Sequence, residues 1–92
     1  MKKLTDRKEE VLEKMRNNPK GWRFQQLRGL LEHFGFDVRQ PSGGGSHAIF
    51  SHPDLDYILS IPRARPIKEF YVKQAVKAVD NLFEKWRHED DL

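Results

Sequence analysis

The sequence contains no cysteine and no long hydrophobic run, and both absences narrow what the protein can be. Without cysteine it can form neither disulfide bonds nor zinc–thiolate sites. No apolar stretch approaches the roughly 18 residues of a membrane-spanning helix, and the first three residues are not followed by the hydrophobic core of a signal peptide. We therefore expect a cytoplasmic protein that has no membrane partner.

Charge of neither sign dominates, and the chain is short. Its 92 residues include 17 Lys or Arg and 14 Asp or Glu, a net charge of +3. The basic excess lies in residues 1–23, and this modest bias only mildly favours an acidic partner such as nucleic acid. A chain of this length forms one small domain, residues 1–92, with a thin core made of one layer of helices and a second layer.

Apolar residues at helical spacing predict three helices. The first covers residues 4–18, begins near Thr5 or Asp6, and ends where Asn, Pro and Gly follow one another. The second carries an apolar stripe over residues 24–34, with Gly35 placed just past its end as a C-cap. The last and longest helix begins at Pro66, in its first turn, and keeps a buried stripe to Trp86.

Three short segments between the second and third helices predict strands. Residues 36–40 alternate apolar and polar side chains, residues 47–51 are mostly apolar, and residues 57–61 end at Pro62. The short connections favour an antiparallel meander. The predicted fold is therefore α+β, in the order α-α-β-β-β-α, with helices on one face of a three-stranded antiparallel sheet and the other face open.

A glycine triplet precedes the only histidine that the pattern places at the start of a strand. Gly43, Gly44 and Gly45 lead through Ser46 into His47. Three glycines contribute no packing, and they permit a tight turn or the close approach of a ligand. Alternation along the strand predicts that His47 projects from the uncovered face, where an imidazole can act as general acid or base. The alternative is an ordinary hairpin loop followed by a strand that happens to begin with His.

Adjacent strand residues point to opposite faces, so a catalytic Ser46–His47 dyad is not expected. Arg63, Arg65 and Lys68 follow the third strand, which neighbours the second, so these cations can lie near His47. A histidine beside such cations suits RNA cleavage, in which a base removes the 2′-OH proton and cations stabilise the phosphorane. The alternative is a solvated linker. The four histidines lack metal-ligand spacing, so we expect no metal and no other cofactor.

Several motifs in a fixed order resemble the HicA toxins of bacterial toxin–antitoxin pairs. They are Gly-Phe at 35–36, Gly-Ser-His at 45–47, His-Pro at 52–53, Ile-Pro-Arg at 61–63 and Pro-Ile-Lys-x-x-Tyr-Val at 66–72. The resemblance covers residues 22–83. It implies a double-stranded-RNA-binding-like fold, ribosome-independent mRNA cleavage, an essential histidine at His47, and neutralisation by a HicB antitoxin.

The resemblance divides the chain into a HicA-like core, residues 22–88, and an added N-terminal helix and linker, residues 1–21. We predict a metal-independent mRNA endoribonuclease with His47 as its catalytic residue and with RNA bound by Gly45, Ser46, Arg63, Arg65 and Lys68. One position departs from the family, because many members carry a histidine where this chain has Ala64. Two alternatives stay open: an RNA-binding module that does not cleave, and a protein-interaction domain that uses the open sheet face.

Overall fold

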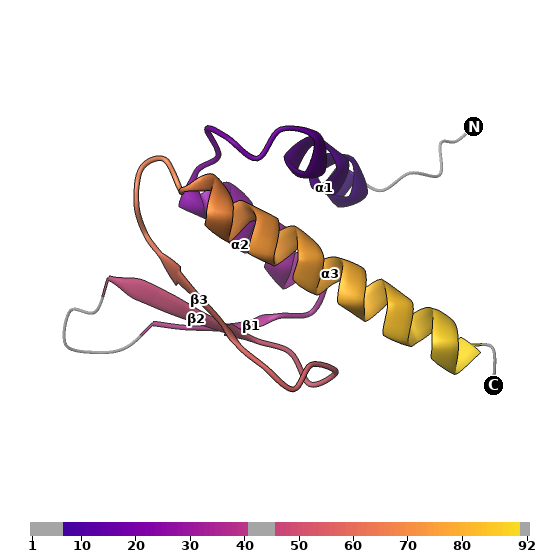
Figure 1. Ribbon diagram of the computed structural model, residues 1–92. Coiled ribbons are helices and arrows are strands. Elements are labelled where there is room, and N and C mark those ends of the chain that lie inside the picture. Colours follow the sequence, from indigo (N-terminus) through magenta and orange to yellow (C-terminus); the bar gives the residue numbers. More distant parts are fainter. Residues whose placement is uncertain (1–6, 41–45, 91–92) are drawn as a thin grey trace.

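The computed structural model describes residues 7–40 and 46–90 and confirms the predicted order of elements (Figure 1). The elements are helices α1 (Arg7–Asn17) and α2 (Phe24–His33), strands β1 (Asp37–Arg39), β2 (His47–Ser51) and β3 (Leu59–Pro62), and helix α3 (Glu69–Asp90). The glycine triplet and the predicted start of the first helix lie outside the described residues. No helix in the described segments is both long and apolar enough to cross a membrane.

The sheet is antiparallel, with β2 in the middle between β1 and β3. Helices α2 and α3 cover one of its faces, as Figure 1 shows. Alternation along β2 decides what each face carries, because Ala48 and Phe50 are fully buried whereas His47 is exposed. Phe50 pairs with Val38 of β1 and with Leu59 of β3, so the helix-facing side is apolar across all three strands.

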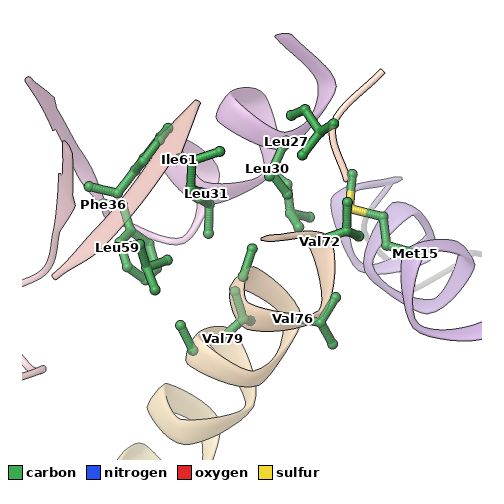
Figure 2. Packing of buried hydrophobic residues seen from close by; sticks show 14 of the residues in the cluster. Met15, Leu27, Leu30, Leu31, Phe36, Leu59, Ile61, Val72, Val76 and Val79 are labelled. Carbon is green, nitrogen blue, oxygen red and sulfur yellow. The ribbon is translucent and has the colours of Figure 1, made fainter. Parts of the chain in front are cut away.

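One hydrophobic cluster joins the sheet to all three helices (Figure 2). Figure 2 shows side chains of α2 and α3 meeting those of β3, with Met15 of α1 reaching the same cluster. Leu12 and Met15 are the buried residues of α1, which packs against α3 and α2. Arg16 of α1 donates two hydrogen bonds to the Asp80 carboxylate of α3, at 2.5 and 2.9 Å. The bonds to Asp80 raise the pKa of the Arg16 guanidinium, which favours its charged form.

Helix α2 ends in a Schellman motif, as the position of Gly35 predicted. Gly35 has a φ of +97°, its N–H donates to the Glu32 carbonyl at 3.0 Å, and the Phe36 N–H donates to the Leu31 carbonyl at 3.0 Å. The left-handed conformation favours glycine because it has no Cβ. The motif turns the chain from α2 directly into β1.

The buried His52 holds this turn in place. Its Nδ1 accepts the Asp54 N–H at 3.0 Å, so its Nε2–H donates to the Phe34 carbonyl, also at 3.0 Å. The ring packs edge-on against Phe36 and is tilted against Trp86, at centroid distances of 5.1 and 5.9 Å. His52 therefore links the end of α2 to the segment between β2 and β3, and its role is structural.

Two predicted starts are wrong by more than one residue. Strand β3 begins at Leu59 because Asp56 and Tyr57 form a bend and Ile58, which is 57% exposed, is not paired with β2. Helix α3 begins at Glu69, so Pro66 does not occupy its first turn. The reason is a tertiary contact: the Ile67 side chain is buried and its N–H donates to the Trp22 carbonyl at 2.9 Å, which holds this segment outside the helix.

Candidate active site

His47 is the first residue of β2 and projects from the face that the helices leave uncovered. It is exposed, it pairs across the sheet with Pro62 of β3, and it shares its face with Ile49 and Ser51. This is the orientation that alternation predicted. The strand therefore fixes the backbone of His47, and the imidazole ring is open to a substrate.

The Ser46 side chain contacts the ring of His47, although strand alternation predicted that the two side chains point to opposite faces. The Ser46 Oγ lies 3.3 Å from the His47 Nδ1. Ser46 forms a bend just before β2, so the alternation that separates neighbouring side chains within a strand does not apply to it. The contact engages Nδ1 and leaves Nε2 as the ring nitrogen available to a substrate.

The backbone of β3 brings the arginines to this end of the sheet. The Arg63 N–H donates to the Ser46 carbonyl at 2.9 Å, which continues the pairing of β2 with β3 by one residue. The Arg63 guanidinium donates to the Gln40 Oε1 at 3.1 Å. As a result Arg63 is held beside Ser46, one residue from His47.

A hollow of about 1190 Å³ lies at the same end of the sheet, between the start of α2 and the segment that follows β3. Of the residues that the structure describes, three arginines and no acidic residue line it: they are Gly21, Arg23, Phe24, Gln25, Gln26, Ser46, Arg63, Ala64, Arg65 and Pro66. None of the three arginines forms an ion pair with a carboxylate among residues 7–40 and 46–90. Ser46 lines the hollow and also touches His47, so it joins the two.

The residues predicted to bind RNA are only partly brought together. Ser46, Arg63 and Arg65 line one hollow, whereas Lys68 is exposed and does not line it. The Lys68 carbonyl instead accepts the Tyr71 N–H at 3.0 Å, at the start of α3. Gly45 lies outside the described residues. Ala64, which departs from the pattern expected from the resemblance, lines the hollow.

Two arginines near the site were not singled out from the sequence. Arg39 of β1 pairs with Ile49, so it shares the uncovered face with His47. The alternation over residues 36–40 contained the information needed to place it. Arg23, just before α2, could not be found in this way, because the two other arginines of the hollow, Arg63 and Arg65, lie about 40 residues away in the sequence.

No three His, Asp or Glu side chains in the described part of the chain lie close enough together to hold a metal ion. The side chains that the site presents are an exposed imidazole, a serine hydroxyl and guanidinium groups. Such a set can transfer protons and bind anions.

Comparison with known proteins assigns this α+β chain to a class: it is a toxin of a bacterial toxin–antitoxin system, which implies an antitoxin as its partner. The family model described as "HicA toxin of bacterial toxin-antitoxin" matches residues 24–80, more than half of the sequence. The chain belongs to the HicA toxin family. The matched region runs from α2 into α3 and leaves α1 outside. Neither the curated proteins nor the solved structures include a match.

Proposed function

We propose that this toxin is a metal-independent endoribonuclease that cleaves mRNA, with His47 as general acid and base, and that a HicB-type antitoxin neutralises it. The observation that carries the proposal is the position of His47. Its ring is exposed on the uncovered sheet face, with Nδ1 3.3 Å from the Ser46 Oγ and with Arg63 held beside Ser46. An exposed acid–base group therefore lies next to Ser46, whose carbonyl accepts the backbone N–H of an arginine suited to bind phosphate.

The reaction follows from these groups. In the tautomer in which Nδ1–H donates to the Ser46 Oγ, the lone pair of His47 Nε2 accepts the proton of a ribose 2′-OH. The 2′-oxygen then attacks the adjacent phosphorus, and the bond from phosphorus to the 5′-oxygen breaks. The departing 5′-oxygen takes a proton from the imidazolium or from water. The products are a 2′,3′-cyclic phosphate and a 5′-hydroxyl end.

The arginines act on the charge that this reaction creates. The phosphorane carries more negative charge than the phosphodiester, so a guanidinium placed beside it stabilises the transition state more than the ground state. We assign this role to Arg63, which follows Pro62, the cross-strand partner of His47. Its guanidinium, bonded to the Gln40 Oε1 in this structure, turns to the phosphate when RNA binds. Arg65 and Lys68 are assigned to binding the RNA backbone away from the bond that is cut, and Gly45 to close approach of the RNA.

Cleavage of a short RNA by the purified protein in the presence of a metal chelator tests the proposal. We expect products that end in 2′,3′-cyclic phosphate. A substrate of the same sequence with 2′-deoxyribose throughout must remain uncut, because it lacks the attacking hydroxyl. Cleavage of the deoxy substrate, or a requirement for added metal, would contradict the mechanism.

Ala64 favours a second candidate, an RNA-binding module of the same fold that does not cleave. A histidine at this position would face the hollow and could protonate the leaving oxygen, whereas alanine cannot. Assays of the parent and of the variant Ala64→His, side by side, distinguish the two functions. Under the first, the parent cleaves and the variant cleaves at least as fast. Under the second, the parent binds RNA without cutting it.

A further inference from the structure

The hollow contains more positive charge than the proposed cleavage step uses. The proposed cleavage step uses Arg63, but Arg23 and Arg65 also line the hollow, and none of the described carboxylates lines it. Guanidinium groups form two parallel hydrogen bonds with phosphate oxygens, a geometry that lysine cannot supply. The lining is therefore suited to bind a phosphate group.

The size and position of the hollow indicate what kind of phosphate it binds. At about 1190 Å³ it exceeds the usual volume of a site for a small molecule, and one inorganic phosphate would fill little of it. It also shares Ser46 with the catalytic histidine, so it continues directly from the place of cleavage. A ligand that extends from the hollow to His47 and pairs with guanidinium groups on the way matches the backbone of a nucleic acid.

We propose that this hollow is a second binding site for the RNA backbone, in which Arg23 and Arg65 hold a phosphate that flanks the cleaved one. The inference rests on the proposed function and adds Arg23, which precedes α2, to the residues that bind substrate. The site places the RNA strand around the end of the sheet, with one phosphate beside α2 and the next ones reaching His47 on the uncovered face.

Binding of a fluorescent single-stranded RNA of about ten nucleotides, measured at several salt concentrations, tests this site. The measurement uses His47→Ala as the background so that no RNA is cut. Adding Arg23→Gln should weaken binding about tenfold, as expected for loss of a charge-assisted hydrogen bond. It should also reduce the slope of log affinity against log salt by about 0.7, the contribution of one phosphate contact in a single strand. Arg65→Gln should behave in the same way.

Arg87→Gln is the matched control, since it removes the same charge from an exposed position near the end of α3, where Arg87 pairs with Glu84. It should leave the slope unchanged. Thermal melting of each variant shows that it is folded. If Arg23→Gln binds RNA with the same salt slope as Arg87→Gln, the proposal of a second site is wrong. The proposed function still holds in that case if the parent cleaves RNA.

Two further outcomes are decisive. If the unmodified chain binds no RNA at all, the proposed function fails, and the second site fails with it. If polyglutamate competes with the RNA as effectively as an unlabelled RNA of equal charge, the hollow recognises acidic protein and the RNA assignment is overturned. Competition by RNA alone supports the site.

Discussion

Replacing Gly35 by alanine should destabilise the protein far more than an ordinary surface substitution, for two separate reasons. Gly35 has a φ of +97°, a conformation that costs a residue with a Cβ about 1–2 kcal/mol. A Cβ at this position would also lie 2.9 Å from the Nε2 of His52. The ring cannot easily yield, because both of its nitrogens are hydrogen-bonded and it packs against Phe36 and Trp86.

The magnitude follows from the contact that must break. Displacing the His52 ring breaks its hydrogen bond to the Phe34 carbonyl, and a buried group left unpaired costs about 1–3 kcal/mol. With the backbone strain, Gly35→Ala should lose about 2–5 kcal/mol of unfolding free energy. A domain of this size loses roughly 4–8 °C of melting temperature per kcal/mol, so the variant should melt at least about 8 °C below the parent.

Gly21 provides the matched control. Its φ is +80°, and a Cβ there would meet nothing within 4 Å. Gly21→Ala therefore has the cost of backbone strain without that of a steric clash. The losses of unfolding free energy of the two variants, measured in urea, should therefore differ by the cost of the contact with His52, about 1–3 kcal/mol. In a His52→Ala background, Gly35→Ala should cost no more than Gly21→Ala. Equal losses for the two glycines in the parent background would refute the reasoning.

Two further perturbations test the packing. Phe50 is fully buried and its ring lies 6.1 Å from that of Phe24, so Phe50→Ala should cost about 3–5 kcal/mol in urea unfolding; a loss below 1 kcal/mol would contradict its place in the core. A double-mutant cycle with Arg16→Ala and Asp80→Ala should give a coupling of about 0.5–1 kcal/mol, because both side chains are more than a third exposed. This coupling should shrink in 1 M salt, and its absence would show that the ion pair does not help hold α1 on α3.

Features that depend on residues close together in the sequence were predictable from it. Alternation placed Phe50 towards the helices and His47 away from them, since a strand repeats every two residues. Gly35 follows the apolar stripe of α2 and so predicted the C-cap. The left-handed backbone conformation at that position favours glycine over any residue with a Cβ.

Features that depend on distant residues were not predictable in this way. Pro66 is a typical first-turn residue, but the hydrogen bond from Ile67 to Trp22 keeps it outside α3, and nothing near Pro66 in the sequence indicates that bond. Arg23 joins Arg63 and Arg65 only because α2 begins beside the end of β3. The Ser46–His47 contact was missed for a different reason, since strand alternation was extended one residue too far.

The rate of RNA cleavage by His47→Ala, measured in single turnover with chelator present and RNA saturating, tests the central claim most directly. His88→Ala, which removes an exposed imidazole near the end of α3, is the control. Acid–base catalysis by His47 predicts a rate about 10²–10⁴-fold below that of the parent, with RNA affinity retained and with the control as fast as the parent. Cleavage by His47→Ala at the parent's rate would contradict the account.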